Sequence, residues 1–346
     1  MNRIEFLKKM VYGVTASSLF PVITQRSGFP AHRSSTKKEF NIQEVPAPMF
    51  DDPIWHGAAD PAIVWNHQEN RWFVYYTQRR ASLENAEGVN WCHGSAIGIC
   101  SSEDGSSWKY EGICQGDDGL NDPIGKECSW WAPGVDYSAS EQRYHMYVTW
   151  VDGIYTSWKG KRFIKHFTSR DGINWDYQAT LDLSSDRCID ACLYKIDGKW
   201  YLWYKDETKG SHTWMAQSPD RYNWSVVGPA VTDCGHEAPY VWQWHGGYWM
   251  IVDAWDKGLR IYRSKSGTGD WQYSNTILKQ PGKRSKDNAR GDHPGILKLH
   301  NQVYILYFVH FRDDDENPEG RKTVLQAAEL EYRDHKIICN RDKFAT

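Results

Sequence analysis

The sequence has little net charge and no long apolar run. Its 41 basic and 44 acidic residues leave a formal net charge of −3, and no polybasic run occurs. Nucleic acid and an anionic membrane surface are therefore not indicated as partners, and a neutral ligand fits better. Beyond an N-terminal leader, no segment approaches about 18 consecutive apolar residues, so no membrane insertion is expected. The 346 residues suit one large domain behind that leader.

The sequence also lacks cysteine motifs for metal binding. None of its eight cysteines forms a CxxC pair or a Cys/His zinc pattern. They are Cys92, Cys100, Cys114, Cys128, Cys188, Cys192, Cys234 and Cys339. An even number in an exported protein permits disulfides, but a fold of this size does not need them, and we expect buried free thiols rather than bridges.

The N-terminal region predicts export. Basic residues precede a mostly apolar stretch, 10–23, which is too short and too rich in Ser, Thr and Gly for a transmembrane helix. We therefore predict an export signal at residues 1–24 and a periplasmic or extracellular protein. A polar, Pro-containing linker or wrapping arm is predicted over residues 25–54.

Aromatic residues, by contrast, are abundant. The chain has 19 Trp, 20 Tyr and 11 Phe, more aromatic surface than a core of this size requires. Sugar rings have apolar C–H faces that stack on aromatic side chains, although Trp also fills β-sheet cores. The composition favours a carbohydrate ligand, and any single Trp fits either role.

Five internal repeats predict the fold. Each has a short apolar strand that opens beside Pro or Ala, then a turn, then an aromatic-rich strand with period-2 alternation. The copies span residues 59–77, 132–150, 189–207, 236–254 and 293–311. Four are followed by turns in which Ser, then Asp or Gly, then Trp recur, ending at Trp108, Trp175, Trp224 and Trp271. We predict an all-β, five-bladed β-propeller over residues 55–346, with these tryptophans between blades and a C-terminal strand closing the ring on the preceding arm.

The residues that open the repeats predict a functional centre. In a propeller the first strand of each blade lines the central channel, so these residues gather around one opening. They are Asp60, Ala132, Asp190, Glu237 and His293. A single Asp at a strand entrance usually caps a turn, but three converging carboxylates repel one another, which a mere scaffold does not require. Hydrolysis of an acetal uses such a set: an acid, a base or nucleophile, and a modulator of their pKa values.

These motifs resemble those of the five-bladed glycoside hydrolases of family 43 and the related family 117. The resemblance spans about residues 55–340 and lies in ADPAIVW, IDACLYKIDGKWYL and HEAPYVWQWHGGYWM, which match family 43 motifs in order and blade. It implies that Asp60 is the general base, Asp190 the pKa modulator and transition-state orienter, and Glu237 the general acid. As the resting acid, Glu237 is expected to have a raised pKa.

Two features depart from the family 43 pattern. Glu237 is preceded by His236 and followed by Ala238, where family 43 has Gly. This is more similar to family 117, in which a neighbouring His takes part in proton transfer, so His236 is a candidate catalytic residue. The N-terminal helical dimerisation segment of family 117 is not evident, however, so both memberships stay open and no oligomeric state is predicted.

Further candidates lie around the opening. His293 occurs in GDHPGIL, where family 43 enzymes often place a His near a central cation or its water. It is either a channel-lining His or a ligand of a structural calcium ion in the channel, and no cofactor is expected to be required. The pair Trp130 and Trp131 is the best stacking platform, and His93, Arg79 and Asp122 are other residues expected near the mouth.

The combined prediction is a glycoside hydrolase that removes terminal arabinose-, xylose- or anhydrogalactose-type sugars from plant or algal oligosaccharides. Inversion is expected because both resembled families invert and Ala59 replaces the Asn of the fructan-type Asn-Asp-Pro nucleophile motif. A short pocket closed by loops around Trp130 and Trp131 predicts exo action. Three alternatives stay open: a retaining fructan-type hydrolase, a glycoside phosphorylase, and a non-catalytic carbohydrate-binding propeller.

Overall fold

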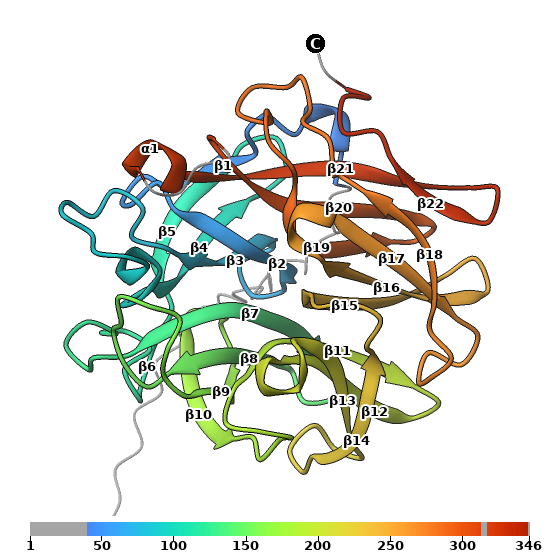
Figure 1. Cartoon of the computed structure of the whole chain (residues 1–346), viewed down its shortest axis with the longest axis horizontal. Helices are drawn as coiled ribbons and strands as arrows, with labels where there is room; N and C mark the ends of the chain where they lie inside the picture. The colour runs from blue at the N-terminus through green and yellow to red at the C-terminus, as the bar shows by residue number, and fades with distance from the viewer. Residues whose placement is uncertain (1–39, 313–316, 345–346) are drawn as a thin grey trace, which may run out of the picture. The chain divides into compact units, whose positions relative to one another are not determined.

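The described residues form five sheets around a common centre (Figure 1). The computed structural model describes residues 40–312 and 317–344, and the predicted export signal lies outside them. Blade 1 contains β2 (Ala58–Asn66), β3 (Arg71–Gln78), β4 (Ala96–Ser102) and β5 (Lys109–Ile113). Blade 2 contains β7 (Ser129–Ser138), β8 (Arg143–Val151), β9 (Arg162–Ser169) and β10 (Asn174–Thr180), with β6 (Gln115–Gly116) parallel to β10.

The remaining blades repeat this order. Blade 3 contains β11 (Cys188–Ile196), β12 (Lys199–Asp206), β13 (His212–Ser218) and β14 (Ser225–Val231). Blade 4 contains β15 (Glu237–Trp244), β16 (Gly247–Asp253), β17 (Leu259–Ser264) and β18 (Gln272–Ile277). Blade 5 contains β19 (Asp292–Leu299), β20 (Gln302–His310), β21 (Thr323–Arg333) and β22 (Lys336–Cys339). The predicted five-bladed β-propeller is confirmed.

The first strand of each blade carries a bulge at the same place. Pairing of β2, β7, β11, β15 and β19 with the next strand is interrupted for two residues. The first of the two has a positive φ: 53° for Asp60, 47° for Ala132, 61° for Asp190, 53° for Ala238 and 39° for His293. Non-glycine residues seldom adopt this conformation, and bulges re-aim side chains. This strained conformation recurs at the same end of all five first strands, so we expect function to be concentrated at that end.

The bulges correct the predicted register of one residue. Ala238, not Glu237, holds the bulge position in blade 4. Glu237 lies one residue before the bulge, as Ala59 does in blade 1 and Asp292 in blade 5. Both positions reach the cavity described below, since Asp60 and Glu237 both line it.

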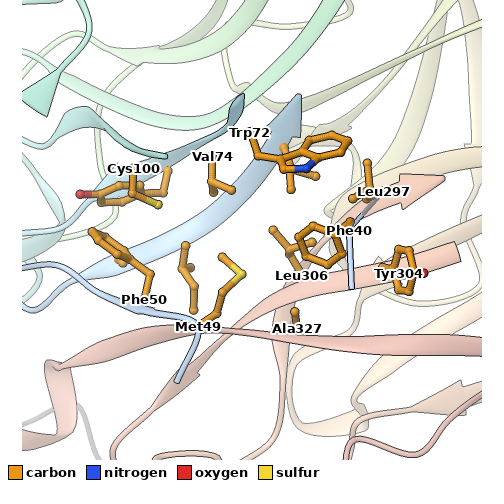
Figure 2. Packing of buried hydrophobic residues seen from close by; sticks show 14 of the residues in the cluster. Phe40, Met49, Phe50, Trp72, Val74, Cys100, Leu297, Tyr304, Leu306 and Ala327 are labelled. Carbon is orange, nitrogen blue, oxygen red and sulfur yellow. The ribbon is translucent and has the colours of Figure 1, made fainter. Parts of the chain in front are cut away.

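Hydrophobic cores fill the spaces between neighbouring blades. Each of the five large buried clusters combines residues from two adjacent blades. Figure 2 shows the cluster between blades 5 and 1, where Trp72 and Leu306 belong to different sheets. At the boundary of blades 1 and 2, the turn residue Trp175 contacts Tyr75 edge to face, with ring centroids 5.8 Å apart. Burial of such large aromatic surfaces holds the blades together.

The predicted Ser-containing turns close in the same way in four blades. In each, the Ser Oγ accepts a hydrogen bond from the N–H three residues later. The pairs are Ser102 with Gly105 at 2.8 Å, Ser169 with Gly172 at 2.8 Å, Ser218 with Arg221 at 2.9 Å and Ser264 with Gly267 at 3.0 Å. The donor residue has a positive φ in all four, which explains the glycine in three of them.

The described part of the predicted arm closes the ring. The short strand β1 (Phe50–Asp51) pairs antiparallel with β21 of blade 5. Phe50 is buried in the core between blades 5 and 1 (Figure 2). Residues 40–54, over which a linker or wrapping arm was predicted, therefore pack on the propeller, and β21 is the C-terminal strand that pairs with this arm.

The cysteines and the helices bear on the earlier expectations. All eight cysteines lie in the described part of the chain as free thiols, and six are buried, as expected. Burial raises the pKa of Cys192 to about 12, so this thiol is unreactive. Among the described residues, no helix has the length and apolar character needed to span a bilayer.

Candidate active site

A cavity of about 470 Å³ lies where the bulges meet, and all five blades contribute to it. Small-molecule sites commonly have volumes of roughly 300–1,000 Å³. The lining residues are Asp60, Arg79, Trp91, Cys92, Trp131, Trp158, Ile189, Asp190, Lys205, Glu207, Glu237, Asp253, Trp255, Arg290, Asp292, His293, Phe308 and His310. The cavity thus brings together the three predicted catalytic carboxyls.

Asp60 contacts two basic side chains. Its Oδ1 accepts a hydrogen bond from Nη2 of Arg79 at 3.1 Å and lies 3.2 Å from Nδ1 of His293. The Arg79 guanidinium lies over the Phe308 ring, 4.6 Å from its centroid. Because Asp60 is buried, it requires such a cationic partner. Blades 1 and 5 together orient this carboxyl.

Asp190 is held by hydrogen bonds to the blades on either side. Its N–H donates to Oγ1 of Thr149 at 3.1 Å, and its Oδ2 accepts from the N–H of Ala238 at 3.0 Å. Burial is the main cause that raises the pKa of Asp190 to about 6; His293 acts against it and Glu237 adds to it. Asp190 therefore fixes the backbone next to Glu237.

Glu237 is paired with a lysine that sequence reasoning missed. Nζ of Lys205 lies 2.9 Å from Oε2 of Glu237 and 3.6 Å from Oε1 of Glu207. Burial alone would raise the pKa of Glu237, but Lys205, then His293 and Arg79, lower it overall. The expected raised pKa of Glu237 is therefore wrong for the free protein, because no sequence motif indicated a cation beside this carboxyl.

Asp253 is a further buried acid that sequence reasoning missed. Its Oδ1 accepts the N–H of Trp255 at 2.8 Å, and its Oδ2 accepts the N–H of His293 at 2.8 Å. Burial, together with Asp292 and Glu237, raises the pKa of Asp253 to about 8. Asp253 ends the second strand of the fourth repeat, and comparing that position across the repeats would have found it.

Ion pairs surround these acids. Nε of Arg290 donates to Asp292 at 2.8 Å, and burial raises the pKa of Asp292 to about 6 despite this partner. Glu207 accepts from the guanidinium of Arg162, which also lies 5.3 Å from the centroid of the Trp131 ring. Burial lowers the pKa of Arg162 to about 10. Arg290 and Asp292 are neighbours in the sequence, whereas no local sequence pattern brings Arg162, Glu207 and Trp131 together.

Only one member of the predicted tryptophan platform reaches the cavity. Trp130 is buried in the core between blades 1 and 2 and donates its Nε1–H to the Gly119 carbonyl at 2.9 Å. Side chains alternate across a strand, so the next residue, Trp131, points into the cavity instead. Three tryptophans not predicted also line it: Trp91 is buried, whereas Trp158 and Trp255 are 53% and 36% exposed. The two exposed residues place aromatic rings at its mouth.

His93 and Asp122 do not line the cavity. His93 is buried behind Trp131, with ring centroids 5.0 Å apart, and burial lowers the pKa of His93 to about 4. Asp122 is exposed and accepts the N–H of Gly125 at 3.0 Å. The predicted Arg79, in contrast, is in the cavity at Asp60.

His236 does not line the cavity. Its Nε2 accepts the N–H of Thr213 at 3.1 Å, and its Nδ1 lies 2.9 Å from the Cys234 carbonyl oxygen. Burial lowers the pKa of His236 to about 4, so the ring is neutral at pH 7. Both ring nitrogens are engaged inside the fold, and this geometry leaves His236 no part in proton transfer to substrate.

Both the side chain and the backbone N–H of His293 have partners in the site. Its Nδ1 faces Asp60, and its N–H is bound to Asp253. Within residues 40–312 and 317–344, no group of three or more His, Cys, Asp or Glu is arranged to hold a metal ion. The calcium ion considered from the sequence stays a prediction, and the reaction proposed for this site does not use one.

The family model of glycosyl hydrolases family 43 matches residues 93–336. The chain belongs to glycosyl hydrolase family 43. This decides between the two families that its motifs resembled, and it makes the protein a glycoside hydrolase that acts on glycosidic bonds of a carbohydrate substrate. No curated protein matches the chain.

Solved structures of family 43 share the fold at low sequence identity. A thermostable family 43 glycoside hydrolase is similar with a TM-score of 0.62 and 16% identity over 84% of this chain and 96% of that chain. A family 43 β-1,3-galactosidase with galactodeoxynojirimycin has a TM-score of 0.60 and 17% identity, over 82% of this chain and 93% of that chain. A family 43 enzyme from Xanthomonas citri complexed with xylose has a TM-score of 0.58 and 14% identity, over 81% of this chain and 89% of that chain. At these identities, the likeness shows the fold alone.

Proposed function

We propose that this family 43 enzyme is an inverting, exo-acting glycosidase in which Asp60 is the general base and Glu237 the general acid. The observation that supports this most is the placement of both carboxyls in one cavity with different partners. Arg79 of blade 1 holds Asp60, whereas Lys205 of blade 3 holds Glu237. Both carboxyls have a cationic partner in the free protein, so the proposed mechanism requires Glu237 to take up a proton before it acts as the acid.

In the proposed reaction, a water attacks the anomeric carbon and gives its proton to Asp60, while Glu237 protonates the glycosidic oxygen. Asp190, bound to the backbone next to Glu237, provides negative charge near the positive charge that develops on the sugar ring. Asp60 ends protonated and Glu237 ionised, and solvent exchange restores both. Inversion requires room for this water, with the carboxyls roughly 6.5 to 9.5 Å apart.

The proposed substrates are short oligosaccharides from plants or algae. A cavity of about 470 Å³ with tryptophans at its mouth suits one or two terminal sugars. Arabinose and xylose are the first candidates, and the similar β-1,3-galactosidase adds galactose; anhydrogalactose is tested with them. We also propose export to the periplasm or outside the cell, which the N-terminal sequence pattern supports.

The test is a screen of the purified protein against such oligosaccharides, followed by substitutions. Asp60→Asn, Asp190→Asn and Glu237→Gln are each expected to lower turnover by about 10²- to 10⁴-fold at unchanged Tm, because each removes a proton-transfer or electrostatic role. Asp122→Asn makes the same charge change outside the cavity and is expected to retain full activity. Wild-type turnover in Asp60→Asn or Glu237→Gln would exclude that residue from the mechanism.

Two product measurements test the stereochemistry and the mode of attack. Proton NMR of the first-formed anomer is expected to show inversion, and retention would replace the proposed base with a nucleophile. Time-resolved product sizing on a hexasaccharide is expected to show single terminal sugars first. Early release of internal fragments would overturn exo action.

A further inference from the structure

One position on the second strand of every blade normally joins that blade to the next. It pairs with the residue just before the bulge and is occupied in blades 1 to 5 by Thr77, Thr149, Lys205, Asp253 and Phe308. In three blades its side chain accepts the N–H of the next bulge residue. The bonds are Thr77 from Ala132 at 2.8 Å, Thr149 from Asp190 at 3.1 Å and Asp253 from His293 at 2.8 Å.

Lys205 cannot do this, because an ammonium group accepts no hydrogen bond. In blade 3 the Ala238 N–H is instead accepted by Oδ2 of Asp190 at 3.0 Å. Lys205 is nevertheless buried, with 4% of its surface exposed. Burying an ammonium is unfavourable unless it is paired, and a threonine here would serve the fold at lower cost. The lysine is therefore explained by what its ammonium contacts.

The ammonium lies between two carboxylates. Nζ of Lys205 is 2.9 Å from Oε2 of Glu237, 3.6 Å from Oε1 of Glu207 and 5.2 Å from the ring centroid of Trp255. Other charged groups also act on Glu237, namely Arg79, Arg162, Asp190, Asp253, Asp292 and His293. Among the described residues, Lys205 is the cation in hydrogen-bond contact with Glu237.

We propose that Lys205 is a positioning residue that holds Oε2 of Glu237, so that Oε1 carries the proton to the leaving group. This rests on the proposed role of Glu237 as general acid. When solvent protonates Glu237, the ammonium moves toward Glu207. After Glu237 gives its proton to the glycosidic oxygen, the new carboxylate regains Lys205. The lysine stays an ammonium throughout and neither gains nor loses a proton.

The test compares Lys205→Thr, Lys205→Met and Lys205→Arg. Threonine restores the residue found at this position in blades 1 and 2, so Lys205→Thr is expected to fold even if Lys205→Met does not. The readout is the pH profile of kcat/KM on the natural disaccharide from the screen, and 2,4-dinitrophenyl β-xyloside and arabinoside are the control substrates. Because glutamine does not titrate, the limb of the wild-type pH profile that is missing from the residual activity of Glu237→Gln is assigned to Glu237.

Loss of the cation is expected to move that limb upward by about one pH unit or more in Lys205→Thr and Lys205→Met, and Lys205→Arg is expected to keep it near wild type. The loss in kcat is expected on the disaccharide and not on the dinitrophenyl glycosides, whose leaving groups need no acid. An unmoved limb, or a raised KM alone, would overturn the proposal. A Glu237→Gln variant with full disaccharide activity would instead show that the acid assignment itself is wrong.

Discussion

Hydrogen-bond partners distinguish Asp253 from the proposed base and acid of the cavity, Asp60 and Glu237. Asp253 accepts two backbone N–H groups, those of Trp255 and His293, so its position is fixed by the fold. Asp60 and Glu237 are paired with side-chain cations instead. A side chain can move when substrate displaces it, whereas a backbone group in a strand moves little. Carboxyl groups that line the same cavity therefore support different functions.

The exposed tryptophans at the mouth give a prediction at this scale. Trp158→Ala and Trp255→Ala are each expected to raise KM on a trisaccharide by about two- to tenfold, because each removes an aromatic face for a sugar beyond the bond that is cleaved. Values of kcat on aryl glycosides are expected to change little. Tyr273→Ala, an exposed aromatic on β18, is the control and should leave both constants unchanged. Equal KM values for wild type and both Trp variants would remove these residues from substrate binding.

At the scale of the element, the bulge of each first strand determines where the chemistry lies. Its positive-φ residue is fixed from the preceding blade, by Thr77 for Ala132 and by Thr149 for Asp190. The same hydrogen bond thus supports a bulge without a carboxyl in blade 2 and a bulge with one in blade 3. These two positions separate the structural effect of the bond from its effect on catalysis.

Thr77→Val and Thr149→Val each leave a buried N–H without its acceptor. Both are expected to lower the free energy of unfolding by about 1–3 kcal/mol, measured by urea denaturation. Only Thr149→Val is expected to lower kcat by tenfold or more as well, because Asp190 loses its orientation. If the two variants lose stability and activity in the same proportion, the bond has no special role at Asp190.

The blades were predictable because each repeat carries its own pattern. The register of Glu237, the proposed general acid, was not predictable in this way. Asp60 and His293 precede prolines at the second bulge position, and this local signal places them correctly. Aligning the acidic residues of the repeats put Glu237 at the bulge position, but Glu237 lies one residue before it. Pro239 marks Ala238 as the bulge residue of blade 4. The pairing of Lys205 with Glu237 and of Arg162 with Glu207 depends on contacts between blades, which no single repeat contains, whereas comparing the repeats would have found Asp253.

At the scale of the whole described ring, stability is shared by neighbouring blades. Every large core lies between two sheets, and β1 ties the start of the propeller to β21 in its last blade. No blade buries its aromatic faces alone, so we expect the ring to unfold as a unit. A buried titratable group at any boundary between blades should therefore affect the stability of the whole.

One such group is a histidine pair in blade 2 against blade 3. Nδ1 of His145 lies 3.0 Å from Nε2 of His166, and the Tyr222 ring of blade 3 contacts both rings at 5.6 and 5.1 Å. Burial is the main cause that lowers the pKa of His145 to about 4 and that of His166 to about 3. The ordinary pKa of a histidine is about 6.5. Both rings are therefore neutral in the folded protein at pH 5, whereas the unfolded chain is protonated there.

Since the folded pKa values are lowered, this contribution to stability is fully present above about pH 6.5 and is lost as the pH falls toward about 4. The free energy of unfolding is expected to decrease by up to about 1.4 kcal/mol per pH unit for each histidine over that range. Urea denaturation between pH 5 and 8 measures it. In a His145→Gln/His166→Gln double variant, the stability curve is expected to be flatter than in wild type, even where absolute stability falls. His300→Gln, which replaces an exposed histidine, should keep the wild-type slope. A double variant with the wild-type slope would show that protonation of this pair does not control the acid sensitivity of the ring.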